Sequence, residues 1–221
     1  MNVLVVCTGN ICRSPVAAQV LAARLSAAGF DEVRVSSAGT NALAGEPMTR
    51  EAAELSRSFG ADPSGHAARQ LTAETVLDAD LVLTATRAHR AKVAELVPRA
   101  ARRAYTLREF ARVLDFLAAD GALDEGAAPP DSIAARLDPA ASTLDLAHPG
   151  ITSRLQQATD AAARSRGLAP PPSDPNDDDI LDPYRAPDAV YDEAGRLIDE
   201  AVDSIMSALA TTSVSGGRGG S

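Results

Sequence analysis

The sequence predicts an α/β fold with three layers, in which helices cover both faces of a four-stranded parallel sheet, plus a largely helical insertion. Short apolar runs of strand length alternate with segments of helical periodicity along the chain. The first run is apolar at consecutive positions, as in strands that are covered on both faces. The 221 residues, 45% of them hydrophobic, can also fill one buried core.

The first strand is predicted over residues 2–6, a run of valine and leucine that ends at Cys7. A helix is predicted from Arg13, because Pro15 suits the first turn of a helix and apolar residues recur behind it at helical spacing. Those residues are Val16, Val20, Leu21 and Leu25. Residues 7–13 are therefore expected to form the turn between the first strand and this helix, and this turn is the expected phosphate loop.

The remaining elements follow in alternation. They are strands over Val33–Ser36, Asp80–Thr84 and Ala104–Thr106, and helices near 47–59 and 88–96. Such crossovers produce a parallel sheet with functional side chains at the carboxyl ends of its strands, where Cys7 lies. A last helix is predicted at about 188–209, where apolar residues share one face and should pack back on the sheet.

The predicted turn at residues 7–13 has the features of an oxyanion site. Successive backbone N–H groups in such a turn point inward, and the following helix adds the positive end of its dipole. Gly9 is expected to supply the unusual backbone dihedral angles. Arg13 adds a planar fork that can donate to two oxygens of one oxyanion. The same field favours a nucleophilic thiolate at Cys7, to which the Ser14 hydroxyl could donate a hydrogen bond.

No metal or other cofactor is expected. The C-x4-C spacing of Cys7 and Cys12 is not a zinc pattern, and the three histidines, at positions 66, 89 and 148, do not complete one. The net charge of −9 disfavours nucleic acid and anionic membranes as partners, because both would repel the chain. With no apolar stretch near membrane-spanning length and no signal-peptide pattern, the expected compartment is the reducing cytoplasm, which a thiolate requires.

The run Cys7–Pro15 resembles the signature of the low-molecular-weight protein tyrosine phosphatases almost letter for letter. Further stretches agree in order, and together the agreement spans residues 2–110 and 180–210. They are Ser37–Thr40, Gly60–Asp62, His66–Leu71, Asp80–Leu83 and Asp182–Tyr184. The resemblance implies a phosphatase that hydrolyses phosphomonoesters, above all phosphotyrosine in proteins, through a phosphocysteine intermediate. Its partners would be phosphorylated proteins or small phosphoesters.

Three residues would carry the chemistry that the resemblance implies. Cys7 would attack phosphorus, Arg13 would clamp the phosphoryl oxygens, and Asp182 would protonate the leaving oxygen and then activate water. Pro183 fits this role of Asp182, because proline restrains the residue before it to extended geometry. Judged without the resemblance, Asp182 is one more acid beside the solvated run Asp177–Asp179.

The resemblance also assigns supporting residues. The phosphate loop would comprise Thr8, Gly9, Asn10, Ile11, Cys12 and Ser14. His66 would hold this loop in shape, together with Asn10 and Ser14, and Tyr184 would form a wall of the substrate pocket. Arg185 stands where the family often has an aromatic residue, and residues 41–45 contain none. The pocket is therefore expected to be shallow, wide, or selective for a phosphoester that is not aromatic.

Residues 111–179 are interpreted as an insertion within a phosphatase domain of residues 1–210. Helices are predicted around residues 113–117 and 151–162, and the insertion would be either a helical cap or a lid over the site. The glycine-rich residues 211–221 are expected to form a disordered tail.

Other interpretations stay open at this point. Arsenate has nearly the shape of phosphate, and an arsenate reductase built on this loop would need an external thiol, because the chain has only two cysteines. A noncatalytic phosphate-binding module would need neither a nucleophile nor an acid. Cys12 could form a reversible, redox-sensitive disulfide with Cys7, or it could simply pack under the loop. The oligomeric state and the physiological substrate are left open.

Overall fold

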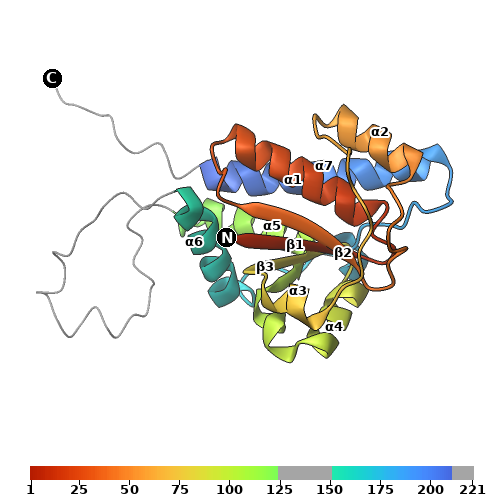
Figure 1. Cartoon of the computed structure of the whole chain (residues 1–221). Helices are drawn as coiled ribbons and strands as arrows, with labels where there is room; N and C mark the ends of the chain where they lie inside the picture. The colour runs from red at the N-terminus through yellow and green to blue at the C-terminus, as the bar shows by residue number, and fades with distance from the viewer. Residues whose placement is uncertain (124–150, 211–221) are drawn as a thin grey trace, which may run out of the picture.

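The computed structural model of the protein describes residues 1–123 and 151–210. Four parallel strands form one sheet in the order β2-β1-β3-β4 (Figure 1). The strands are β1 Asn2–Cys7, β2 Arg34–Gly39, β3 Leu81–Thr84 and β4 Ala104–Thr106. The predicted four-stranded parallel sheet is therefore confirmed, with small shifts at the ends of individual strands.

Helices connect the strands in the predicted alternation. They are α1 Arg13–Ala27, α2 Arg50–Ser58, α3 Ala73–Leu77, α4 Arg87–Leu96, α5 Leu107–Ala119, α6 Ile151–Ser165 and α7 Asp188–Ala210, with 3₁₀ turns η1 Pro98–Arg103 and η4 Pro175–Asp178. Helix α2 begins at Arg50 and not at 47, because the Thr49 side chain caps it by accepting the Ala52 N–H. The five-residue helix α3 was not predicted, because it is too short to show helical periodicity.

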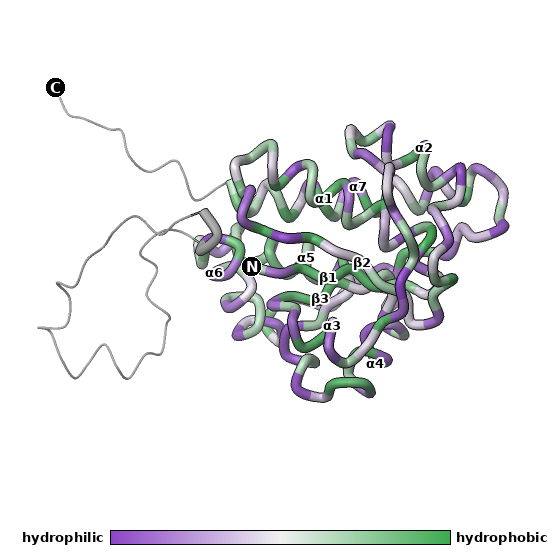
Figure 2. Tube along the Cα trace, in the orientation of Figure 1, coloured by the Kyte–Doolittle hydropathy of each residue, from purple (hydrophilic) through white to green (hydrophobic). Residues whose placement is uncertain are grey.

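The sheet separates two apolar layers. Alternate residues of β1 face opposite sides, so that Val3 and Val5 pack with α1, α5 and α7, whereas Leu4 and Val6 pack with α3 and α4. Figure 1 shows these helices on the two sides of the sheet, and Figure 2 shows the largely hydrophobic strands β1 and β3 between them. The three-layer arrangement is confirmed.

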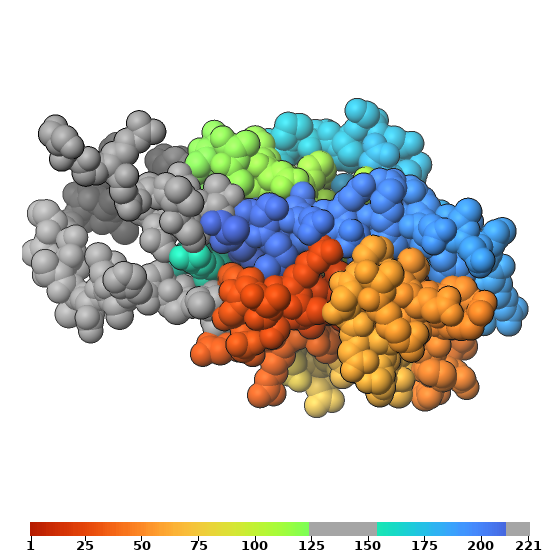
Figure 3. All heavy atoms as spheres, turned by 90° about the horizontal axis from the view of Figure 1, so that it is seen from above, coloured from red at the N-terminus to blue at the C-terminus, as the bar shows by residue number. Residues whose placement is uncertain are grey.

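Helix α7 returns along the first layer, between α1 and α2 on one side and α5 on the other (Figure 3). Helix α6 packs on α5 through Leu155, Ala158 and Ala162, all buried in the same apolar cluster. The two helices predicted within 111–179 are thus present, although α5 already begins at Leu107 and belongs to the core. Residues 124–150 of the predicted insertion and the predicted tail at 211–221 lie outside the described residues.

A buried carboxylate of α5 holds the segment after α6. Glu109 of α5 accepts from Arg166 at 2.8 and 3.0 Å and forms a second ion pair with Arg90 of α4. Burial alone would raise the pKa of Glu109, but the hydrogen bond and charge of Arg166 outweigh it and lower that pKa. The Arg166 guanidinium also lies 4.0 Å from the centroid of the Tyr105 ring. These contacts of Arg166 therefore hold the start of the segment that leads to Asp182.

In residues 1–123 and 151–210, no helix has both the length and the apolar character needed to cross a membrane. The carboxyl ends of β1, β2 and β3 lie at the same edge of the sheet. The strand order reverses at β1, with β2 on one side of it and β3 on the other. Open α/β sheets bind ligands at this edge, beside the strand where the order reverses.

Candidate active site

The turn between β1 and α1 directs its carbonyl groups outward. Each carbonyl from Cys7 to Ile11 accepts a hydrogen bond from outside the turn. The donors are Thr40 N to Cys7 O at 2.9 Å, Asn41 N to Thr8 O at 3.0 Å, Leu43 N to Gly9 O at 3.1 Å, His66 Nε2 to Asn10 O at 2.7 Å and Thr49 N to Ile11 O at 3.0 Å. Because a trans peptide holds its N–H opposite its C=O, the amide groups of residues 8–12 face inward, where they can bind an anion.

Asn10, and not Gly9, adopts the left-handed backbone conformation of this turn. Its φ is 58°, whereas Gly9 is not among the residues with positive φ, so the expectation for Gly9 is wrong. Asparagine tolerates this region of backbone dihedral angles, and here the conformation lets its side chain form three hydrogen bonds. Its buried side chain donates to Ser14 Oγ at 3.0 Å and to Ser37 Oγ at 2.9 Å and accepts the Arg69 N–H at 2.8 Å.

Glycine is required at position 39 by a close backbone approach. A Cβ at Gly39 would lie 2.4 Å from the Thr8 carbonyl oxygen and 3.1 Å from Ala42 Cα. The absence of a side chain lets the segment after β2 come near enough to donate to the carbonyls of Cys7 and Thr8. At Gly9, by contrast, an added Cβ would meet only Ile11 Cγ1, at an ordinary 3.5 Å.

Cys7 and Ser14 are joined at the base of the turn. Cys7 Sγ lies 2.9 Å from Ser14 Oγ, and both residues are buried. Since Ser14 Oγ already accepts a hydrogen from the Asn10 side chain, its own hydroxyl hydrogen is free to be donated to the sulfur. A donor in this position stabilises negative charge on Cys7, which is the form that acts as a nucleophile.

Arg13 connects the turn to the segment before α7. Its guanidinium donates to the Ile180 carbonyl at 3.0 Å and forms a 2.7 Å ion pair with Asp182. The side chain of Arg13 is 5% exposed and that of Asp182 is 53% exposed, so the carboxylate faces both the turn and solvent. The other oxygen of Asp182 accepts the Tyr184 N–H at 3.2 Å, which fixes the direction of the carboxyl group.

Two acids of the run before Asp182 are anchors of this segment and not solvated side chains. Asp178 accepts from Arg112 of α5 at 2.9 and 3.3 Å. The Asp179 carboxylate accepts from the backbone N–H and the guanidinium of Arg87 at the start of α4. The Arg112 guanidinium also donates to the Pro170 carbonyl at 2.6 Å. The conformation around Asp182 is therefore held from both α4 and α5.

His89 is a site residue to which the sequence analysis gave no role. It is 8% exposed, and its Nε2 lies 2.9 Å from Thr8 Oγ1 while its Nδ1 lies 2.7 Å from Thr86 Oγ1. Burial, and then the charge of Arg13, lower the pKa of His89 to about 4, so the ring is neutral near neutral pH. A neutral ring has one N–H, so one ring nitrogen donates to a threonine hydroxyl and the other nitrogen accepts from the second threonine.

Cys12 is buried where α1 begins. Its Sγ lies 3.6 Å from Thr49 Oγ1 and 3.8 Å from the Tyr191 hydroxyl, and burial raises the pKa of this thiol. Cys12 is therefore buried beside the turn, and its reversible disulfide with Cys7 stays a prediction.

A cavity of about 150 Å³ opens above Cys7. Its walls combine the turn with residues from two other segments: Cys7, Thr8, Gly9, Ile11, Cys12, Arg13, Asn41, Leu43, Asp182 and Tyr184. The structure thus brings Cys7, Arg13 and Asp182 to one cavity with Tyr184 at its rim, while His66 supports the turn from outside. Leu43, 40% exposed, supplies the apolar wall that the sequence analysis did not find, because that search was for an aromatic residue.

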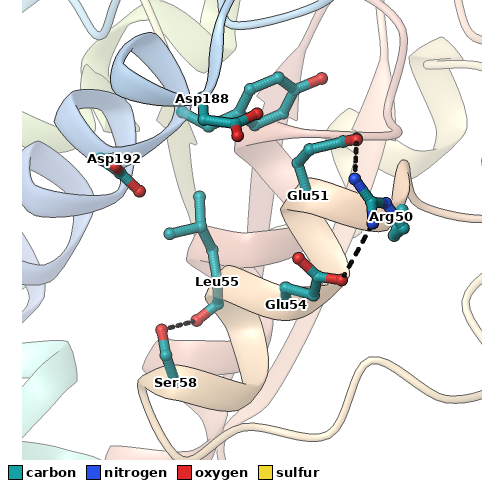
Figure 4. Close-up of a pocket in the computed structure, with 8 residues that line it drawn as sticks. Arg50, Glu51, Glu54, Leu55, Ser58, Asp188 and Asp192 are labelled. Atoms are coloured by element: carbon teal, nitrogen blue, oxygen red, sulfur yellow. Dashed lines mark hydrogen bonds and ion pairs between the residues drawn. The ribbon is translucent and has the colours of Figure 1, made fainter.

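A larger hollow of about 350 Å³ lies between α2 and α7, and its charge is wrong for a phosphate (Figure 4). The carboxylates of Glu51, Glu54, Asp188 and Asp192 line it, and its one cation, Arg50, contacts Glu51 and Glu54. An anion would be repelled there. Among the described residues, no group of three or more His, Cys, Asp or Glu side chains is placed to hold a metal ion.

Comparison with known proteins identifies the family that has this fold and this cysteine-arginine turn. Residues 2–120 match the family model of the low molecular weight phosphotyrosine protein phosphatases. The chain belongs to this family. The resemblance of residues 7–15 to the signature of this family is thereby confirmed.

Individual relatives agree. The Escherichia coli K12 low molecular weight protein-tyrosine-phosphatase Etp is 41% identical over 97 residues, which are 44% of this chain and 62% of Etp. The chain thus matches less than two thirds of that relative's length. The corresponding phosphatase structure from T. tengcongensis has a TM-score of 0.60 at 25% identity and covers 94% of this chain and 98% of its own. The Geobacillus stearothermophilus arginine phosphatase YwlE shares the fold, with a TM-score of 0.57 at 23% identity over 93% of this chain and 90% of its own.

Proposed function

We propose that this protein is a metal-independent phosphatase that hydrolyses phosphomonoesters, chiefly phosphotyrosine in proteins, through a phosphocysteine intermediate. The observation that carries the proposal is the convergence of Cys7, Arg13 and Asp182 on one cavity with the inward amides of residues 8–12. This set meets the three needs of phosphoryl transfer, which are a nucleophile, charge stabilisation and an acid.

The reaction proceeds in two balanced steps. The Cys7 thiolate attacks phosphorus while the bond from phosphorus to the ester oxygen breaks, and the protonated Asp182 gives its proton to that oxygen. The Asp182 carboxylate then takes a proton from water, whose oxygen attacks phosphorus as the S–P bond breaks. Inorganic phosphate leaves, and Cys7 returns to the thiolate. Arg13 and the turn amides stabilise the equatorial oxygens in both steps.

The alcohol side of the substrate meets apolar walls. Ile11, Leu43 and Tyr184 line the cavity beside Cys7, and contact with an aryl ring favours a phosphotyrosyl side chain. Tyr184 at 42% and Leu43 at 40% exposure leave the mouth open to a peptide. We infer a phosphatase domain of residues 1–210 containing the insertion 111–179, which acts in the reducing cytoplasm that a thiolate nucleophile needs.

A leaving-group series tests this function. Asp182→Asn should lower kcat/KM for phenyl phosphate and phosphotyrosine much more than for p-nitrophenyl phosphate, because kcat/KM reports the attack by Cys7 and a good leaving group needs little protonation in that step. Cys7→Ser should abolish turnover of all three while keeping affinity for inorganic phosphate. Equal losses across the series would contradict the role of Asp182, and turnover by Cys7→Ser would contradict the phosphocysteine.

The same preparations separate the rival functions. Phosphoarginine belongs in the substrate panel, because one structural neighbour is named an arginine phosphatase. Arsenate-dependent consumption of an added thiol without phosphate release would favour the reductase. Tight phosphate binding without turnover of any substrate would favour the noncatalytic module.

A further inference from the structure

Arg185 has a backbone conformation that side chains with a Cβ rarely adopt. In the described part of the chain, only Asn10 and Arg185 are non-glycine residues with positive φ, at 58° and 62°. The left-handed conformation of Asn10 is explained by its three side-chain hydrogen bonds in the phosphate loop. Arg185 lies in a turn closed by Ala186 N–H to the Pro183 carbonyl at 2.9 Å. Such outliers cluster at functional sites, and this one follows the pocket residue Tyr184.

The conformation places the Arg185 guanidinium at the rim of the cavity. Its Cζ lies 5.0 Å from the centroid of the Tyr184 ring. Tyr184 lines the cavity and Arg185 does not, so the cation covers the ring from outside the cavity. A ring face attracts the charge but satisfies none of the N–H donors at the edges of the planar guanidinium. These donors therefore stay available in an exposed position.

The other arginines around the site are occupied. Arg13 binds Asp182, Arg87 binds Asp179 and Arg112 binds Asp178. None of the ion pairs found within residues 1–123 and 151–210 includes Arg185. In a chain with a net charge of −9, an arginine without a carboxylate partner at the mouth of a phosphate site is well placed to bind an anion of the substrate.

We propose that Arg185 makes this protein select phosphotyrosine that is flanked in the substrate by an aspartate or glutamate. This proposal rests on the phosphatase function proposed above. When a phosphotyrosyl side chain enters between Tyr184 and Leu43, the peptide backbone lies at the cavity mouth, and consecutive Cα atoms are only about 3.8 Å apart. A side chain next to the phosphotyrosine therefore reaches the rim, where the guanidinium fork can take its carboxylate with two parallel hydrogen bonds.

The expected effect is moderate. An exposed ion pair changes kcat/KM by about two- to fivefold. It should act through KM, with kcat little changed, because the contact is the same in the ground state and in the transition state. It should also weaken with added salt.

The experiment compares phosphotyrosyl peptides that differ only in carrying glutamate or glutamine beside the phosphotyrosine, on either side, with the full-length chain. Wild-type protein should prefer a glutamate peptide about two- to fivefold, and Arg185→Gln should bring the ratio close to one. Arg185→Lys should keep part of the preference, because it keeps the charge but not the fork. Arg99→Gln is the matched control, since Arg99 is exposed in η1, before the amino end of β4, and its loss changes the net charge equally.

Hydrolysis of p-nitrophenyl phosphate, which has no flanking residue, should be the same in all four proteins. An unchanged glutamate preference in Arg185→Gln, or no preference in wild type, would overturn the role of Arg185 while leaving the phosphatase intact. Failure of the wild type to hydrolyse p-nitrophenyl phosphate would overturn the proposed function, and the role of Arg185 with it.

Discussion

Acidification from about pH 7 to about pH 5 tests the protonation state of His89. The pKa of this buried ring is lowered from 6.5 to about 4 in the folded protein. Between these two values the unfolded chain binds a proton that the folded chain does not, so stability falls as the pH falls through this window. Above about pH 6.5 the contribution is fully present, and below about pH 4 it is lost.

The magnitude follows from the two pKa values. Linkage gives a loss of about 2 kcal/mol from His89 between about pH 7 and pH 5, of a total of about 3 kcal/mol. In the variant His89→Gln the amide can still donate to Thr8, but it does not titrate. The variant should therefore lack this part of the pH dependence, even if it is less stable overall.

Urea unfolding of both proteins at several pH values measures this difference. The gap between wild type and His89→Gln should shrink by about 2 kcal/mol from pH 7 to pH 5. Parallel loss of stability in the two proteins would refute the lowered pKa of the buried His89. Other histidines cancel in the comparison, because both proteins carry them.

Three further changes follow from the site. Gly39→Ala should lower the unfolding free energy by about 1 to 3 kcal/mol and weaken phosphate binding, because its Cβ would lie 2.4 Å from Thr8 O. Gly9→Ala, whose Cβ would make only ordinary contacts, should lower the unfolding free energy less. Equal losses of stability in thermal unfolding would argue against the close approach at Gly39. Arg112→Met should lower kcat for phenyl phosphate by loosening the segment that carries Asp182, whereas wild-type kcat together with a lower melting temperature would make Arg112 purely structural. Peroxide should inactivate the enzyme, and a dithiol should restore it through a Cys7–Cys12 disulfide; identical recovery in Cys12→Ser would remove that role.

The sheet and the phosphate loop could be predicted because their signals are local. The valine-rich run before Cys7 and the proline behind Arg13 mark a strand end and a helix start without any tertiary information. Helix α3 and the first residue of α2 were harder to predict. Side-chain hydrogen bonds of the N-cap residues Thr72 and Thr49 determine where these two helices begin.

Residues that act through tertiary contacts were harder to find. His89 looked like one of three scattered histidines until the fold brought it to Thr8, from which it is 81 positions away in the chain. Asp178 and Asp179 looked like a solvated acidic run, because their partners Arg112 and Arg87 belong to α5 and α4. The left-handed residue was assigned to Gly9 on propensity, but the hydrogen bonds of the Asn10 side chain decide the conformation.

The phosphoryl group on Cys7 is the most direct test of the account. During turnover of p-nitrophenyl phosphate, Asp182→Asn should still form the intermediate but hydrolyse it slowly, because no carboxylate activates the water. Rapid denaturation followed by mass spectrometry should then find one phosphoryl group on the peptide that contains Cys7, and none on that peptide in Cys7→Ala. A phosphoryl group on another residue, or continued turnover by Cys7→Ser, would contradict the proposed mechanism.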